Sequence, residues 1–186
     1  KKTMLIAQQL YEGNFEIPDY SGGLITYMRT DSVTLSKEAL AMANEVIEKR
    51  FGNVFTLEKP RSFRNRTKNA QEAHEAIRPV NLEILPDQVI PHLERDQGRL
   101  YALIWKRTLA TQMKAAKIAR TTFRINAGEK SEYQFEAKGQ QILFPGFLKV
   151  YMDSSSDAQS VLGEKDLLLP RVEQGQRLPL KDLNAE

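Results

Sequence analysis

The stretch from residue 121 to residue 137, TTFRINAGEKSEYQFEA, decides the fold class because polar and apolar residues alternate in it twice. The residues that share one side of these two runs are Thr121, Phe123 and Ile125, then Tyr133, Phe135 and Ala137. A period of two predicts β-strands, and Asn126-Ala127-Gly128 between the runs is typical of a turn. We therefore predict an antiparallel strand segment here, and we expect strands to continue through 143–151 and 167–169.

The sequence before residue 117 has the longer period of amphipathic helices. One helix is predicted between Ser36, whose hydroxyl can accept a backbone N–H at a helix start, and Gly52, which ends the pattern. Further helices are predicted over 2–12, 69–77 and 99–114, and a short strand over 24–28. In the last helix we expect Leu100, Leu103 and Ile104 to point inward, with Trp105 widening the apolar surface.

Together these patterns predict an α+β fold with two domains. The first, residues 1–117, is mainly helical with a short strand, and the second, residues 118–186, is an antiparallel all-β segment. The chain has 186 residues, which is enough for two small cores. No apolar run approaches the roughly 20 residues of a membrane-spanning helix. The chain has no cysteine, which excludes disulfides and thiolate zinc sites and fits a reducing cytosol.

A basic segment lies between Lys59 and Lys68. It carries five cations and no acid, together with Phe63. The cations are Lys59, Arg61, Arg64, Arg66 and Lys68. Cations beside an aromatic ring suit single-stranded nucleic acid, because phosphates meet the cations and a base can stack on the ring. The alternative is an ordinary solvated loop, and the segment alone does not decide between them.

Residues 24–32, LITYMRTDS, place Tyr27 two positions before Arg29 and four before Asp31. A phenol oxygen can attack a phosphodiester, and a guanidinium can stabilise the charge of the phosphate through paired hydrogen bonds. The alternative is that Tyr27 merely packs, as most tyrosines in strands do. This segment is therefore a candidate active site that needs a second group.

The second group is His74, one of only two histidines, in the segment TKNAQEAHEAIRP from residue 67 to residue 79. An imidazole can donate a hydrogen bond to a phosphate oxygen, and Asp31 is a candidate to orient the ring. Glu72 and Glu75 beside His74 also raise the possibility of a metal site. Glu72 is better explained as a helix cap with Asn69, so we predict no metal site in this chain.

Three segments in this order resemble bacterial type IA DNA topoisomerase I: GLITYMRTDS at 23–32, AQEAHEAIRP at 70–79 and GQQILFPGFLKVY at 139–151. The resemblance implies that Tyr27 is the nucleophile and becomes joined to a DNA 5′ phosphate. Arg29 is then expected to hold the scissile phosphate, and His74 and Asp31 to assist. It implies an ATP-independent isomerase that relaxes negatively supercoiled DNA by cleaving, passing and resealing one strand.

The resemblance also implies that the chain is a fragment, the catalytic-tyrosine domain with part of the neighbouring arch that acts as a hinge. The magnesium-binding acidic triad of the family belongs to another domain, so we expect no cofactor on this chain and no cleavage by the fragment alone. The expected partners are single-stranded DNA, contacted also by Arg61, Arg64, Arg66 and Lys68, and the missing domains. The expected location is the bacterial cytoplasm, at the nucleoid.

Two other classes of protein compete with this interpretation. A noncatalytic single-stranded DNA-binding module would need the basic segment but no nucleophile. A tyrosine recombinase or relaxase would also join tyrosine to DNA, but a recombinase usually places its tyrosine late in the chain. A relaxase would need a metal-binding histidine cluster, so the order of residues here favours the topoisomerase.

Overall fold

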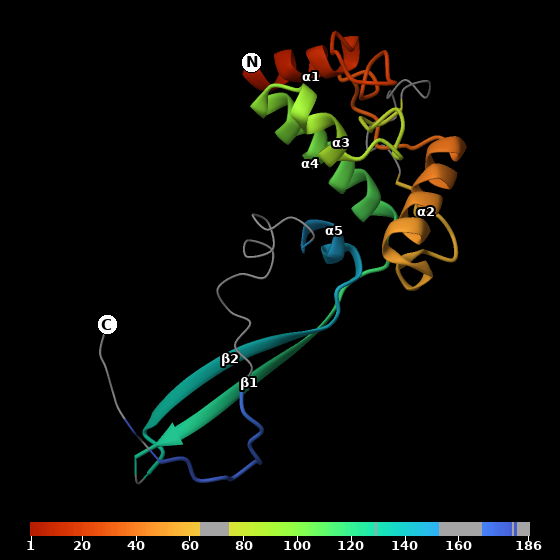
Figure 1. Cartoon of the computed structure of the whole chain (residues 1–186). Coiled ribbons are helices and arrows are strands. Elements are labelled where there is room, and N and C mark those ends of the chain that lie inside the picture. The colour runs from red at the N-terminus through yellow and green to blue at the C-terminus, as the bar shows by residue number, and fades with distance from the viewer. Residues whose placement is uncertain (64–74, 129, 153–168, 180, 182–186) are drawn as a thin grey trace.

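The computed structural model describes residues 1–63, 75–128, 130–152, 169–179 and 181 (Figure 1). The helices and strands within these residues are α1 (Lys2–Glu12), α2 (Lys37–Phe51), α3 (Pro86–Val89), α4 (Arg95–Gln112), β1 (Lys117–Ala127), β2 (Tyr133–Phe144) and α5 (Lys149–Met152). The chain is thus a mixed α+β fold, as predicted. The four helices that precede β1 gather at one end, and the β1–β2 hairpin extends away from them (Figure 1).

Helix α2 begins and ends where its sequence signals predict. The Ser36 hydroxyl accepts a hydrogen bond from the Ala39 backbone N–H at 3.1 Å, and Gly52 ends the helix with a φ of 98°. Its inward face includes Ala43 and Ile47, both without exposed surface. Local capping and apolar spacing therefore agree in this helix, which packs against α4.

Helix α4 begins four residues earlier than predicted, at Arg95. Its start is capped by the Gln97 side chain, which accepts a hydrogen bond from the Glu94 backbone N–H at 2.9 Å. The prediction that Leu103 points inward is wrong, because this side chain is 57% exposed. The buried face instead follows Tyr101, Trp105 and Leu109.

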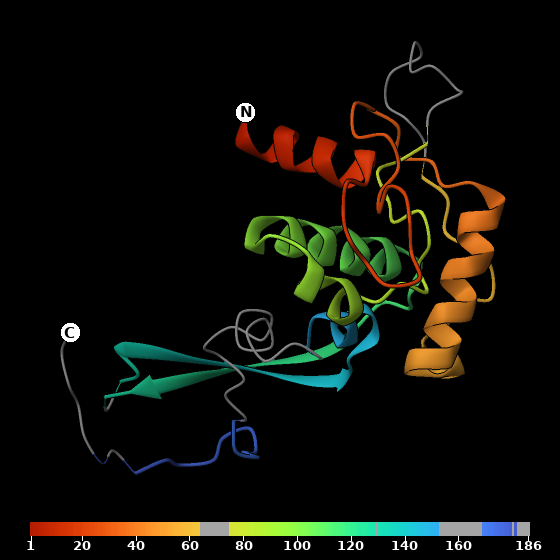
Figure 2. The same cartoon turned by 45° about the horizontal axis from the view of Figure 1, so that its top comes forward.

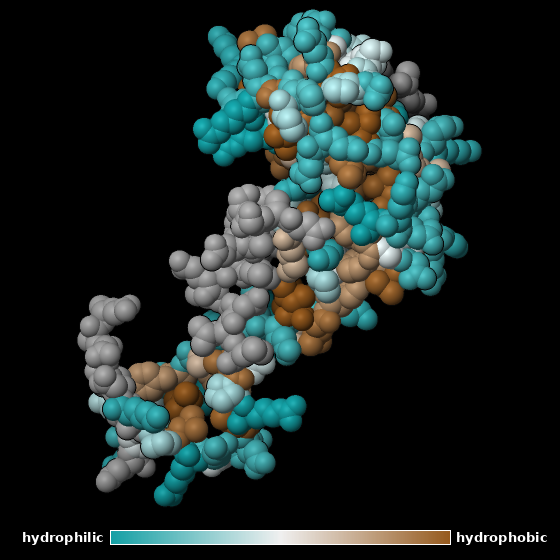
Figure 3. Space-filling model, in the orientation of Figure 1, coloured by the Kyte–Doolittle hydropathy of each residue, from teal (hydrophilic) through white to brown (hydrophobic). Residues whose placement is uncertain are grey.

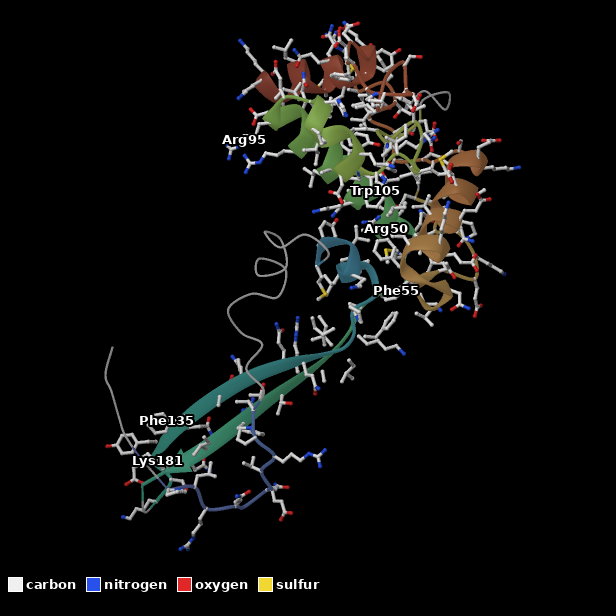
Figure 4. The ribbon with its side chains drawn as sticks, viewed as in Figure 1. Arg50, Phe55, Arg95, Trp105, Phe135 and Lys181 are labelled. Carbon is white, nitrogen blue, oxygen red and sulfur yellow. The ribbon has the colours of Figure 1, made fainter. Side chains whose placement is uncertain are left out.

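Tyr101 and Trp105 can be buried because their polar atoms have partners. The Tyr101 hydroxyl donates to the Ile84 carbonyl at 2.7 Å, and the Trp105 indole N–H donates to the Leu82 carbonyl at 2.9 Å. Burial of Tyr101 also raises the pKa of its hydroxyl well above the ordinary value. The Arg50 guanidinium lies 5.8 Å from the centre of the Trp105 ring, which joins α2 to α4 (Figure 4).

The core lies where α1, α2 and α4 meet the loops between them, and α4 contacts both other helices (Figure 2). Its fully buried side chains include Leu10, Leu24, Ile25, Ile47, Leu82 and Leu109. Two of these, Leu24 and Ile25, lie three and two positions before the candidate nucleophile Tyr27. In the part of the chain that the structure describes, no helix is both long and apolar enough to cross a membrane.

The two strands form an antiparallel pair, with Phe123 opposite Ala137 and Ile125 opposite Phe135. One face of this hairpin is therefore apolar. Towards the turn that face remains open, since Tyr133 is 64% and Phe135 is 47% exposed, and hydrophobic residues are visible on this part of the hairpin in Figure 3. The hairpin agrees with the alternation in the sequence.

The expected strand over 143–151 is wrong beyond Phe144. Residues Gly146–Leu148 form a 3-10 turn and α5 follows directly. Pro145 lacks the N–H that a strand ladder needs, and Gly146 has a φ of 50°, which turns the chain. The sequence 167–169 lies outside the described residues except for residue 169, which is not in a strand.

The hairpin joins the helical part at an aromatic contact. The rings of Phe55 and Phe144 stack with centroids 5.1 Å apart and planes 27° apart (Phe55 is labelled in Figure 4). The Lys114 N–H donates to the Phe55 carbonyl and the Phe147 N–H donates to the Lys114 carbonyl, both at 2.9 Å. The change from helix to strand falls here, between residues 112 and 117, while the division into two domains at 117 stays a prediction.

Candidate active site

Tyr27 is an exposed phenol in a buried frame. Its side chain is 45% exposed, whereas Ile25 and Met28 beside it are 1% and 6% exposed. The predicted strand over 24–28 is reduced to a single bridge between Ile25 and Pro79. Because the buried neighbours anchor the backbone, the Tyr27 ring is presented to solvent from a fixed position.

On one side this loop is held by the end of α1. The Leu24 N–H donates to the Leu10 carbonyl at 2.8 Å, and the rings of Tyr27 and Tyr11 form a T-shaped pair with centroids 5.4 Å apart. Gly23 lies so close to α1 that a Cβ there would overlap the Tyr11 carbonyl. Glycine is therefore required for steric reasons at this position, four residues before the candidate nucleophile.

On the other side the loop is held by residues 76–80. The Thr26 N–H donates to the Arg78 carbonyl at 2.9 Å, and the Arg78 N–H donates to the Thr26 hydroxyl oxygen at 3.0 Å. The Thr26 hydroxyl in turn donates to the Ala76 carbonyl at 2.9 Å. The residue that precedes Tyr27 is thus bound through both its backbone and its side chain.

The segment 75–80 is itself braced by an ion pair that sequence reasoning missed. Arg78 donates from Nε and Nη2 to the two carboxylate oxygens of Glu75, at 2.7 and 2.9 Å. The Glu75 carboxylate also accepts the Ser36 N–H at 2.7 Å. Burial acts to raise the pKa of Glu75, but the hydrogen bonds from Arg78 and Ser36 outweigh it and lower the pKa. The spacing of three residues between Glu75 and Arg78 was the available signal.

Arg29 and Asp31 follow Tyr27 and are both exposed. Asp31 lies at an apolar groove of about 640 Å³ between α1, α4 and residues 28–35. Asp31 is also a residue type that can cap a turn, here the turn before α2. In the structure Thr30 and Ser32 do this, since their hydroxyl oxygens accept the N–H groups of Ser32 and Thr34 at 3.0 and 3.2 Å.

His74 lies outside the described residues, as do Arg64, Arg66 and Lys68. The structure therefore gives no distance between His74 and Tyr27, and the roles of these residues stay predictions. The next residue, Glu75, is described, and it belongs to the segment that holds Thr26. The helix predicted over 69–77 is wrong for residues 75–77, which are not helical.

Arg61 is the one predicted DNA-contacting residue of the basic segment that the structure describes. Its Nη1 donates to the Thr111 carbonyl at 3.0 Å and its Nη2 to the Met113 carbonyl at 3.3 Å. Its backbone N–H also donates to the Gln112 side chain at 3.0 Å. Arg61 thus anchors the described start of the segment, residues 59–63, to the end of α4, and its contact with DNA stays a prediction.

The described residues do not form a site suited to magnesium. Among them, no three His, Cys, Asp or Glu side chains gather closely enough to hold a metal ion. Glu75, the acid next to His74, is engaged by Arg78 and Ser36. The magnesium expected for the complete enzyme, bound outside this chain, stays a prediction.

Comparison with known proteins identifies the family. A sequence model described as DNA topoisomerase matches residues 1–186. This chain belongs to the DNA topoisomerase family. Among its topoisomerase relatives, DNA topoisomerase 1 of Rickettsia felis is 44% identical over 183 residues, covering 98% of this chain and 23% of the relative. DNA topoisomerase 1 of Xylella fastidiosa is 41% identical over 186 residues, covering all of this chain and 23% of the relative.

A solved topoisomerase has a similar fold. Full-length topoisomerase I from Thermotoga maritima superposes with a TM-score of 0.66 and 39% sequence identity, over 81% of this chain and 23% of that protein. The family resemblance seen in the three sequence segments is thereby confirmed. The chain spans about a quarter of the length of these topoisomerases. The activity of a complete topoisomerase therefore involves residues outside this chain.

Proposed function

We propose that this chain carries the nucleophile of a type IA topoisomerase, which relaxes negatively supercoiled DNA by cleaving and resealing one strand. The observation that carries the proposal is the Tyr27 side chain, which is 45% exposed although Ile25 and Met28 are buried. One part of the ring packs on Tyr11, and the rest stays open to solvent. The frame leaves the phenol oxygen accessible to a DNA strand.

The reaction exchanges one phosphodiester for another. The Tyr27 phenol oxygen forms a bond to a backbone phosphorus as the bond from that phosphorus to the DNA 3′ oxygen breaks. The phenol gives up its proton, and the released 3′ oxygen takes one, so a 5′-phosphotyrosine and a 3′ hydroxyl result. The reverse attack reseals the strand after another strand has passed, and no nucleotide is hydrolysed.

The neighbouring residues have proposed roles in this exchange. Arg29, exposed two positions after Tyr27, holds the scissile phosphate and stabilises the charge that grows on it. His74 donates a hydrogen bond to a phosphate oxygen, with Asp31 orienting the ring. The magnesium expected for the complete enzyme is proposed to bind outside this chain, and these roles do not depend on it.

The test uses the complete enzyme and single-stranded DNA labelled at its 3′ end, because a 5′-phosphotyrosine leaves the downstream fragment on the protein. We expect Tyr27→Phe to abolish the labelled adduct and the relaxation of supercoiled DNA. The matched control is Tyr11→Phe, since Tyr11 is 42% exposed and its ring touches that of Tyr27. An adduct with Tyr27→Phe would contradict the proposal.

The chain alone is proposed to fold and bind single-stranded DNA weakly without cleaving it, because the magnesium-binding domain is missing. Incubating residues 1–186 with labelled DNA and magnesium should give no adduct. The competing function, a noncatalytic single-stranded DNA-binding module, predicts instead that Tyr27→Phe leaves relaxation by the complete enzyme intact. The same variant therefore separates the two functions.

A further inference from the structure

We propose that Glu75 and Arg78 are positioning residues, which set the place of the Tyr27 nucleophile by acting through Thr26. The inference rests on the proposed function, because it concerns the same tyrosine. Neither residue touches the phenol. Their effect is carried by a continuous chain of hydrogen bonds that starts one residue before Tyr27.

The first link is Thr26, whose backbone N–H and side-chain hydroxyl both bind the segment 76–80. Ile25 adds a bridge to Pro79, and the Val80 N–H donates to the Leu24 carbonyl at 3.0 Å. The three residues before Tyr27 are therefore all bound to this segment. Any shift of the segment must move the backbone from which the phenol projects.

The second link is the Arg78 side chain, which is fully engaged within the protein. Besides the two bonds to Glu75, its Nη1 donates to the Pro79 carbonyl at 2.8 Å and to the Val80 carbonyl at 3.2 Å. Only 12% of the Arg78 side chain and 26% of the Glu75 side chain is exposed. Every nitrogen of this guanidinium has a partner, so Arg78 is a brace for the segment and is not placed to hold a phosphate.

The third link joins the pair to a rigid element. Ser36, whose N–H donates to the Glu75 carboxylate, is the cap residue of α2, and the Ala76 N–H donates to the Thr34 carbonyl at 2.8 Å. A carboxylate is also favoured near the positive end of a helix. The clamp formed by Glu75, Arg78 and Thr26 thus connects the Tyr27 loop to the start of α2.

The two sides of the loop have different supports. The α1 side is held by the backbone hydrogen bond from Leu24 to Leu10 and by the close backbone approach at Gly23. On the other side the loop is supported by the clamp, whose charged residues Glu75 and Arg78 are partly buried. Since a displacement of about 1 Å at a reacting group can cost about 100-fold in rate, loss of the clamp should slow attack by Tyr27 while leaving its chemistry unchanged.

The test compares variants of the complete enzyme in a single-turnover assay of adduct formation at saturating single-stranded DNA. Glu75→Gln keeps the shape of the side chain and removes its negative charge. Arg78→Lys keeps the positive charge but cannot form the paired hydrogen bonds that the planar guanidinium makes with Glu75. We expect each to lower the rate per folded molecule about 10- to 100-fold. The affinity for DNA, measured with Tyr27→Phe also present, should stay unchanged.

Two further comparisons keep the test decisive. The control Glu83→Gln removes an exposed acid whose ion pair with Lys49 is 3.9 Å long, and it should leave the rate unchanged. If the pair variants unfold, Thr26→Val and Thr26→Ser replace them. Valine keeps the shape and loses the hydroxyl, so it should slow adduct formation, and serine should restore it.

The possible failures are distinguishable. Wild-type rates per folded molecule in Glu75→Gln, Arg78→Lys and Thr26→Val would overturn the positioning role, even if their melting temperatures fall. Weaker DNA binding with an unchanged rate at saturation would overturn it as well. If Tyr27→Phe itself still forms the adduct, the proposed function fails, whatever the clamp variants do.

Discussion

Replacing Arg61 with alanine should destabilise the chain by about 1–2 kcal/mol. The change removes the two hydrogen bonds from the guanidinium to the carbonyls of Thr111 and Met113, at 3.0 and 3.3 Å. Carbonyls at a helix end lack intrahelical partners, and a cation there is favourable. Charged hydrogen bonds contribute about 1.5–3 kcal/mol each when protected, and we expect less here because Arg61 is exposed.

Urea unfolding of residues 1–186 measures this difference. The control is Lys59→Ala, which removes an exposed cation from the same segment and should change the free energy of unfolding by less than about 0.5 kcal/mol. Equal stability of the two variants would refute the anchoring role of Arg61. The salt dependence of single-stranded DNA binding by the complete enzyme then shows whether Arg61 also contacts a phosphate, which would lower the slope by about 0.7.

Three other outcomes are expected in unfolding measurements. Tyr101→Phe should cost about 1–2 kcal/mol, because it leaves the Ile84 carbonyl without its 2.7 Å donor. Gly146→Ala should cost about 1–3 kcal/mol, because φ is 50° and the new Cβ would lie 2.5 Å from the Lys114 carbonyl oxygen. The pKa of Glu75 is lowered in the folded state, so its contribution is present above the ordinary value of 4.5 and is lost as the pH falls towards the lower folded value. The wild type should therefore lose stability in that acidic range relative to Glu75→Gln.

The parts of the fold that sequence could predict are those fixed by neighbouring residues. Helix α2 is bounded by Ser36 and Gly52, and both act as local caps. The hairpin follows from alternation on both sides of one turn. In these elements the residues that decide the structure lie within a few positions of each other.

The rest depends on contacts between distant segments. Tyr101 is buried in place of Leu103 because the Ile84 carbonyl, in a preceding loop, accepts the hydrogen bond of its hydroxyl, which spacing within α4 does not reveal. In the candidate site, Tyr27 and Arg29 could be singled out by residue type and order. The clamp could not, because Thr26 and Arg78 are 52 residues apart in the sequence.

The stacked rings of Phe55 and Phe144 lie where the long β1–β2 hairpin joins the helical part of the chain. Strand β2 has 12 residues, which corresponds to roughly 40 Å at about 3.3 Å per residue. A rotation of about 10° at this junction would carry the turn of the hairpin through about 7 Å over that length. Angular differences too small to disturb the helical core will therefore be conspicuous at the far end of the hairpin when related structures are superposed.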